Sequence, residues 1–274
     1  MRLSRQQGPL DNHRRRFVTG SQPACVTEVA TLLHKGQRKM LEDRLHVGSW
    51  WWVLADGMGG QGAGDLAASA AVKAAAAALS RTKFAPRNEA EADALLDAVG
   101  DEAQQAVVDA AFNSEVLTAG STLLVLLLSS ERRLHVGWVG DSRAYVVAGG
   151  EVVQKTRDHT AGARTQAAGP NFSDGGLTRH LGYRAARGSE MGLLDTTSCD
   201  QPASGRVVLC SDGVWSAVRP AEFDAIVRRA GTATGAASDL RKAVLAAGAP
   251  DNFAAVVIDF VSVDGPSSSS APPD

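Results

Sequence analysis

VLADGMGGQGAGD, residues 53–65, is an apolar run that stops at Asp56 and continues into glycines. Residues 57–62 fit GxGxxG, a pattern that follows a strand and opens a helix in dinucleotide-binding folds. Such a fold needs a parallel strand ending in an acid within about 30 residues, whereas the helix expected here leads to the polar stretch RTKFAPRNEAEAD (81–93). The Asp56 carboxylate would also repel a pyrophosphate. We therefore interpret Asp56 as a binding group in its own right.

Two further carboxylates are expected beside Asp56. RLHV (44–47) and WWWVLA (50–55) are separated only by Gly48 and Ser49, which is the spacing of a two-residue hairpin turn. Counting back from this turn pairs residue 47 with 50 and residue 42 with 55. Glu42 and Asp43 should then lie at the same end of the hairpin as Asp56.

Three more aspartates stand at the ends of apolar segments. Asp212 follows RVVLC (206–210) and Asp251 precedes FAAVVIDFV (253–261). If these two strands run antiparallel, both carboxylates emerge at one edge of a sheet. Asp141 follows LHVGWV (134–139) and is expected opposite Gly120 in another hairpin. The pattern predicts a cluster of carboxylates drawn from distant parts of the chain.

The remaining segments indicate the fold class. Most strands are joined by short turns and the helices come in pairs, which favours an α+β sandwich of largely antiparallel sheets over a doubly wound sheet. The meander predicted over residues 121–154 is joined by the turns SSER, GDS and AGG. The other expected elements are a strand at 24–33 and helices at 65–80, 89–111, 220–231 and 237–249.

Composition predicts one large domain. The chain has 274 residues, 44% of them apolar, and a formal net charge of −2, so nothing global attracts nucleic acid. Its three cysteines show neither metal-ligand spacing nor disulfide density, which favours a reducing cytoplasm. We expect a basic flexible tail at 1–20, a folded domain at 21–263 and a disordered Ser/Pro-rich tail at 264–274, with no membrane span.

A cluster of carboxylates favours divalent cations, because like charges that meet must be neutralised. The candidate ligands are all oxygens, which selects Mg²⁺ or Mn²⁺ rather than Zn²⁺. Gly57 suits such a site, since its carbonyl could approach a metal without a Cβ in the way. Two ions bridged by one carboxylate would supply a reactive hydroxide at neutral pH, which predicts hydrolysis of a phosphate ester.

Eight short motifs occur in the order typical of one enzyme family. The chain resembles the bacterial form of the metal-dependent serine/threonine protein phosphatases of the PPM, or type 2C, class. The resemblance runs from about Thr27 to Phe260 and implies a four-layer αββα sandwich with a binuclear Mg²⁺ or Mn²⁺ centre. The motifs are RKMLED (38–43), ADGMGG (55–60), GSTL (120–123), VGDSRAY (139–145), RDHT (157–160), LTRHLG (177–182), LCSDGVW (209–215) and PDN (250–252).

The resemblance also implies roles for individual residues. Asp56 would bridge the two ions, with the Gly57 carbonyl as a further ligand, and Asp212 and Asp251 would bind the other ion. Asp141 matches a ligand of a third, weaker ion. An outer group of Glu42, Asp43 and Asn252 would orient water, and Arg38 would bind the substrate phosphate. Arg38, Asp56 and Asp212 are the residues expected to carry catalysis.

The function expected from these features is hydrolysis of phosphoserine and phosphothreonine in proteins, reversing a bacterial serine/threonine kinase in the cytoplasm. The expected partners are a phosphorylated protein and its kinase, with no nucleic acid and no membrane. A catalytically silent regulatory module of the same fold is the alternative. Loss of metal-binding aspartates would favour that alternative, but all four candidates are present.

Overall fold

The computed structural model describes residues 26–59, 62–116, 118–164, 176–182 and 193–260. The expected tails, residues 1–20 and 264–274, lie outside this range, as do both boundaries of the expected domain 21–263. None of the described helices is both long enough and apolar enough to cross a membrane.

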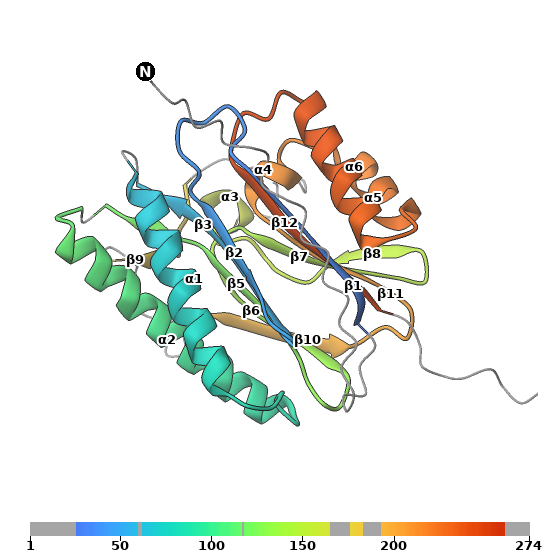
Figure 1. The fold of residues 1–274 in the computed structure, drawn as a ribbon, viewed down its shortest axis with the longest axis horizontal. Coiled ribbons are helices and arrows are strands. Elements are labelled where there is room, and N and C mark those ends of the chain that lie inside the picture. The colour runs from blue at the N-terminus through green and yellow to red at the C-terminus, as the bar shows by residue number, and fades with distance from the viewer. Residues whose placement is uncertain (1–25, 60–61, 117, 165–175, 183–192, 261–274) are drawn as a thin grey trace, which may run out of the picture.

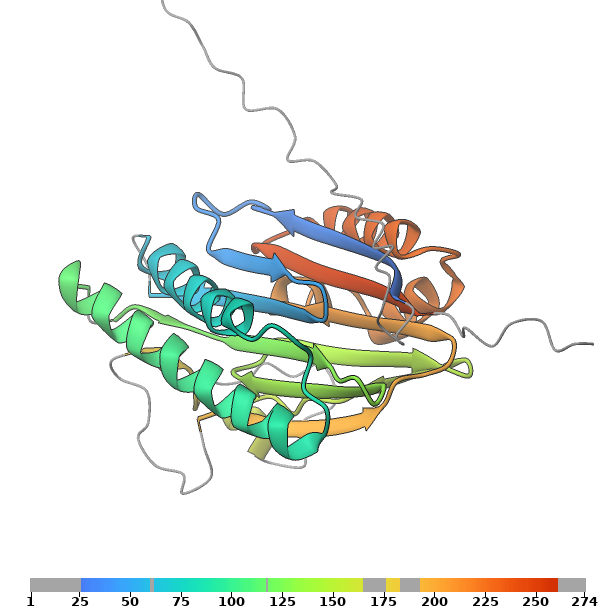
Figure 2. The ribbon, with the colours of Figure 1, turned by 60° about the horizontal axis from the view of Figure 1, so that its bottom comes forward.

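Two antiparallel sheets face each other, as the edge-on view in Figure 2 shows. The first has the order β1-β12-β11-β7-β8 and the second has the order β10-β6-β5-β3-β4-β9, with β2 also paired to β3. The strands of the first sheet are β1 (Val26–His34), β7 (Arg143–Ala148), β8 (Glu151–Gln154), β11 (Gly205–Cys210) and β12 (Phe253–Phe260). Those of the second are β2 (Asp43–Val47), β3 (Trp51–Met58), β4 (Gly120–Ser121), β5 (Leu123–Leu128), β6 (Arg133–Val139), β9 (Leu181–Gly182) and β10 (Asp195–Asp200).

Helices cover the outer face of each sheet (Figure 1). Helix α1 (Ala63–Arg81) packs on β2 and β3 beside α2 (Glu89–Asn113), while α6 (Ala233–Ala246) packs on β1 and β12 beside α5 (Pro220–Arg229). The short helices are α3 (Ala161–Arg164) and α4 (Asp212–Trp215). Local chemistry sets several starts: Asn88 caps α2 by accepting a hydrogen bond from the Glu91 N–H, and Pro220 opens α5. The predicted α+β sandwich is confirmed.

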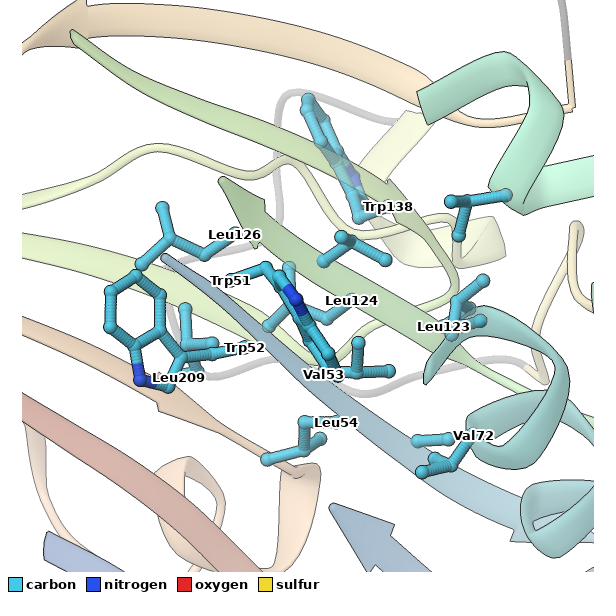
Figure 3. Close-up of a cluster of buried hydrophobic side chains, with 14 of the residues drawn as sticks. Trp51, Trp52, Val53, Leu54, Val72, Leu123, Leu124, Leu126, Trp138 and Leu209 are labelled. Atoms are coloured by element: carbon cyan, nitrogen blue, oxygen red, sulfur yellow. The ribbon is translucent and has the colours of Figure 1, made fainter. Parts of the chain in front are cut away.

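The core fills the space between the sheets and beneath the helices. The largest cluster of buried apolar side chains joins residues of both sheets, including Trp52 and Leu54 of β3 and Leu209 of β11 (Figure 3). All three tryptophans at 50–52 are buried. A second cluster lies between the first sheet and helices α5 and α6. Each sheet packs against the other sheet on one face and against helices on the opposite face. The strand ends at their common edge are therefore fixed in position.

Two predicted registers are wrong. In the β2–β3 hairpin Val47 pairs with Trp52, not with residue 50, and Asp43 lies directly opposite Asp56. The Gly48 N–H donates a hydrogen bond to the Trp51 carbonyl at 2.8 Å, so the turn includes residue 50, and the Trp51 ring packs beside Gly48. Gly120, which was expected opposite Asp141, instead pairs with Met58 and Gly182.

The predicted meander is also wrong, because its strands divide between the two sheets. Strands β5 and β6 belong to one sheet and β7 and β8 to the other. Gly140, with φ of +106°, lies in the segment that carries the chain across. Strand β10, which pairs with β6 at the edge of the second sheet, was not predicted.

Candidate metal centre

The ends of four strands place acidic residues at one edge of the paired sheets. Asp212 follows β11 and Asp251 precedes β12, and these strands are antiparallel neighbours with Cys210 opposite Ala255. Asp212 and Asp251 border a cleft of about 450 Å³. The predicted site residues that line it are Arg38, Glu42, Asp56, Gly57, Asp141, Asp212, Asp251 and Asn252. The remaining predicted residue, Asp43, lies beneath the cleft and is fully buried.

The carboxylates of the cleft repel one another in a poorly solvated site. Burial raises the pKa of Asp56 well above its ordinary value, and the neighbouring charges of Asp43, Asp212 and Asp141 add to the effect. Burial likewise raises the pKa of Asp43 to about 7, with a smaller opposing effect from the Ser211 hydroxyl. The pKa of Asp141 rises to about 7 through burial and then through Asp212. A positive charge in the cleft would relieve this repulsion.

The donor set fits a hard cation. Glu42 Oε1 and Asp43 Oδ1 are buried without a hydrogen-bond partner in the described part of the chain, which is costly unless a cation or water satisfies them. As the described residues are placed, no three His, Cys, Asp or Glu side chains already lie in a ready-made ligand set for one ion. Small side-chain shifts would let the carboxylates share an ion, and backbone oxygens and water can complete its coordination shell. Mg²⁺ and similar ions commonly keep several waters in protein sites.

Gly57 has a packing role that the sequence did not reveal. The end of β3 crosses the first turn of α1 so closely that a Cβ on Gly57 would lie 2.0 Å from the carbonyl oxygen of Gly64. A Cβ on Gly64 would in turn lie 2.7 Å from Glu42 Oε1. Small residues at both positions bring the first turn of α1 against the cleft. The proposed use of the Gly57 carbonyl as a ligand stays a prediction.

The dinucleotide alternative for residues 57–62 does not fit this fold. The neighbours that β3 pairs with are all antiparallel to it, and α1 leads into α2 rather than to a parallel strand. A cleft lined with carboxylates also disfavours a pyrophosphate.

Comparison with known proteins identifies the family. Residues 33–246 match the family model described as Protein phosphatase 2C. The chain belongs to this family.

Two bacterial phosphatases are among the relatives that the chain matches. The chain is 33% identical over 226 residues to the serine/threonine protein phosphatase PstP of Mycobacterium tuberculosis, a match that covers 81% of this chain but only 43% of PstP. It is 26% identical over 210 residues to the serine/threonine phosphatase stp of Listeria innocua, covering 76% of this chain and 83% of stp. The crystal structure of the PstP catalytic domain with two manganese ions superposes with a TM-score of 0.71 at 27% identity, covering 85% of this chain and 98% of that chain.

Arg38 lies at the mouth of the cleft of this protein phosphatase 2C member. Its Nη2 lies 2.6 Å from Asp251 Oδ2, and its side chain is 54% exposed. Asn252 holds the same loop from the other side: its Oδ1 accepts a hydrogen bond from the Glu42 N–H, and its Nδ2 donates to the carbonyls of Lys35 and Met40. The loop that carries Arg38 and Glu42 is therefore fixed to the residue next to Asp251.

Two hydroxyl groups that support the carboxylates were not assigned a site role from the sequence. The buried Ser211 hydroxyl donates to Asp43 Oδ2 at 2.8 Å and accepts from the Ala254 N–H. Thr122 Oγ1 accepts a hydrogen bond from the Asp56 N–H, and the Thr122 N–H donates to the Asp56 carbonyl. Both residues lie in quoted motifs, GSTL and LCSDGVW, which was the only signal available.

Proposed function

We propose that this protein hydrolyses phosphoserine and phosphothreonine in proteins, using two bound Mn²⁺ or Mg²⁺ ions. In the cytoplasm it would remove phosphate that a serine/threonine kinase has added. The observation that carries the proposal is the convergence of Asp56, Asp141, Asp212 and Asp251 on one cleft. Two relatives named as serine/threonine phosphatases, and the two manganese ions bound by one of them, support it.

Each residue has a proposed part in holding the ions. Asp56 would be a ligand of both ions, the Gly57 carbonyl would be a further ligand, and Asp212 and Asp251 would bind the other ion. Asp141 contributes to a third, weaker site. Glu42, Asp43 and Asn252 form the surrounding layer that orients ligands and water, as outer groups do in metal sites.

The chain's own groups are suited to phosphate hydrolysis. Bound Mn²⁺ or Mg²⁺ would lower the pKa of a coordinated water and so supply a nucleophile at neutral pH. Asp43 has one oxygen held by Ser211 and the other, Oδ1, buried without a partner among the described residues, so Oδ1 could accept a hydrogen bond from a water that helps to fill the site. Arg38 presents a planar guanidinium at the mouth of the cleft, where it can pair with two phosphate oxygens.

The direct test of the proposed function is hydrolysis of a phosphothreonine peptide by the purified protein. We expect phosphate release with Mn²⁺ and none after chelation by EDTA, restored when Mn²⁺ is added in excess. A folded, Mn²⁺-loaded protein that releases no phosphate would instead support the silent regulatory module.

Arg38→Ala should weaken substrate binding, measured by KM, more than it slows the reaction of bound substrate, measured by kcat. A hydrogen bond to a charged group contributes about 1.5–3 kcal/mol, so we expect kcat/KM to fall about 10- to 100-fold, mostly through KM. Arg38→Lys should recover only part of this loss, because an ammonium cannot pair with two oxygens in one plane. Steady-state kinetics on the phosphothreonine peptide measures both.

The neighbouring exposed Lys39 provides the control for Arg38. Lys39→Ala changes charge in the same loop but removes no cleft-lining group. Equal losses in the Lys39 and Arg38 variants would mean that Arg38 acts only through the general charge of the loop.

A further inference from the structure

His159 makes more directed contacts than a filler of the core requires. It is 8% exposed, and its Nδ1 accepts a hydrogen bond from the Gly140 N–H at 3.1 Å. Its backbone N–H donates to the Gly140 carbonyl at 2.9 Å. Both main-chain polar groups of Gly140 are therefore bonded to this one residue, and Gly140 is followed directly by Asp141.

The second ring nitrogen fixes the tautomer. His159 Nε2 lies 3.1 Å from Asp195 Oδ2 and 3.1 Å from Arg179 Nη1, and Arg179 also pairs with Asp195. Since Nδ1 must be an acceptor for the Gly140 N–H, Nε2 carries the proton and donates a hydrogen bond to Asp195 Oδ2, while Arg179, a donor only, acts through its pairing with Asp195. The Trp138 indole stacks on the imidazole, with ring centroids 6.1 Å apart, and further restricts its rotation.

The Gly140–Asp141 segment is held by these contacts and by bonds to the residues that follow, including the one between the Ser142 and Thr122 hydroxyls at 3.0 Å. Gly140 has φ of +106°, and a Cβ there would lie 2.5 Å from Thr122 Cγ2, so no side chain can anchor the turn at this position. Beyond it, the Asp141 carbonyl accepts a hydrogen bond from Trp215 Nε1 at 3.0 Å. His159 and Trp215 thus hold the backbone on the two sides of the Asp141 carboxylate.

The same histidine is tied to the wall of the cleft. Its carbonyl accepts a hydrogen bond from the Thr178 N–H at 2.7 Å, and the adjacent Thr160 pairs with Leu177. Thr160 and Leu177 both line the cleft. One residue therefore joins the Asp141 turn to the wall that faces it.

We propose that His159 is a positioning residue that holds the Asp141 carboxylate in the cleft, and that Arg179 and Asp195 hold His159 in the single tautomer this requires. The inference rests on the proposed function only in taking Asp141 as a ligand of the weakest-bound ion. It assigns a task to a buried group that touches neither substrate nor the proposed ions. It also links the Asp141 site to β10, at the far edge of the second sheet.

Two substitutions separate the two ends of the imidazole. Asparagine places an acceptor oxygen near the position of Nδ1, so His159→Asn can keep the bond from the Gly140 N–H. Glutamine places its amide near the position of Nε2, so His159→Gln can reach Asp195 but leaves the Gly140 N–H unpaired. A group that merely fills space would not distinguish them.

The test is titration of the metal-free full-length variants with Mn²⁺, followed by calorimetry and by the electron paramagnetic resonance signal of free Mn²⁺. We expect His159→Gln to weaken the weakest class of Mn²⁺ site about 10- to 100-fold, the usual loss when an outer partner is removed, and His159→Asn to stay within about threefold of wild type. Equal Mn²⁺ affinities in the two variants would overturn the proposal.

Asp195→Ala keeps the proposal testable if His159→Gln does not fold, because the Asp195 side chain is 42% exposed. It should weaken the same Mn²⁺ site, whereas Asp200→Asn at the other end of β10, with a side chain 86% exposed, should not. Unchanged Mn²⁺ binding in Asp195→Ala would overturn the part of the proposal that concerns the tautomer. A wild type that binds Mn²⁺ but releases no phosphate would refute the proposed function alone, since these affinities are read without substrate.

Discussion

Asp212→Asn is expected to lose at least about a thousandfold in kcat/KM, since a catalytic metal contributes several kcal/mol and each 1.4 kcal/mol is tenfold in rate. The substitution keeps the shape of the side chain and an oxygen that can accept the hydrogen bond from the Gly213 N–H. It removes the negative charge of Asp212, which burial and the nearby Asp251 carboxylate already destabilise. It also removes one proposed ligand of the cation. Phosphopeptide kinetics with Mn²⁺ and calorimetric Mn²⁺ titration measure the two effects.

The fold of the Asp212→Asn variant should survive. With one fewer negative charge in the cleft, its metal-free melting temperature should equal or exceed that of wild type. Asp239→Asn, on the exposed face of α6 beside Lys242, is the matched control and should leave kcat/KM unchanged. An Asp212→Asn variant that is unfolded, or one that retains more than a tenth of wild-type activity, would contradict this role.

The metal-free protein should lose stability as the pH rises from 6.5 to 8. Asp43 and Asp141 have a pKa raised to about 7 by burial, and the pKa values of Asp56 and Asp212 are also raised. A folded-state pKa above the unfolded value of about 3.9 means that the folded protein binds more protons. The stabilisation that these extra protons give the folded protein is complete below the pKa that the carboxyl groups have in the unfolded chain. It is lost as the pH rises through their pKa in the folded protein.

The expected size of this pH effect is a few kcal/mol, because one pKa unit corresponds to about 1.4 kcal/mol. At about 2–4 °C per kcal/mol for a domain of this size, the melting temperature should fall by several degrees. Burial lowers the pKa of His34, His135 and His159, which acts in the opposite direction but mainly below the ordinary histidine pKa of about 6.5. Above pH 6.5 the carboxylates therefore outweigh the histidines, and the two thiols whose pKa burial raises add only a small decline near pH 8.

Calorimetry with EDTA and with saturating Mn²⁺ checks the pH effect. Bound Mn²⁺ favours ionised carboxylates, so the decline should flatten or reverse when the ion is present. Asp56→Asn should show a shallower decline with EDTA than wild type. A melting temperature that rises between pH 6.5 and 8 in EDTA would show that the pKa values of the carboxyl groups in the cleft are not raised.

The fold class could be predicted because its signals are local and repeated. Apolar strands joined by short turns, an alanine-rich helix at 63–81 and a proline at the start of α5 all follow from intrinsic preference and period. Antiparallel pairing of β11 with β12 was the condition for bringing Asp212 and Asp251 to one edge, and the structure shows it. The family resemblance, now confirmed by the match over residues 33–246, covers the same elements.

The errors in the fold arose where distant packing overrides a local pattern. GDS has the composition of a tight turn, but the chain passes at Gly140 into the opposite sheet, with a positive φ and with Thr122 so close that no Cβ would fit. Strand β10 is DTTSCD, a polar edge strand whose residues are only partly buried, so it lacks the alternation that marks a strand. The β2–β3 register follows the hydrogen bond from the Gly48 N–H to the Trp51 carbonyl, which a count of turn residues does not contain.

The candidate site could be predicted as a set of residues but not as a set of contacts. Strand ends bring Asp43 opposite Asp56 even though the expected register was two residues off. The support of Asp43 by Ser211 and the fixing of Gly140 by His159 join segments more than 15 residues apart through only one or two hydrogen bonds. Such bonds leave no periodic trace in a sequence.

The most direct test of the central claim is anomalous diffraction at the manganese edge from crystals of the wild-type protein grown with Mn²⁺. Convergent carboxylates predict at least two anomalous peaks in the cleft, with Asp56 contacting both and with Asp212 and Asp251 at one of them. A saturated crystal with no peak in the cleft, or with peaks that none of these three residues contacts, would contradict the account.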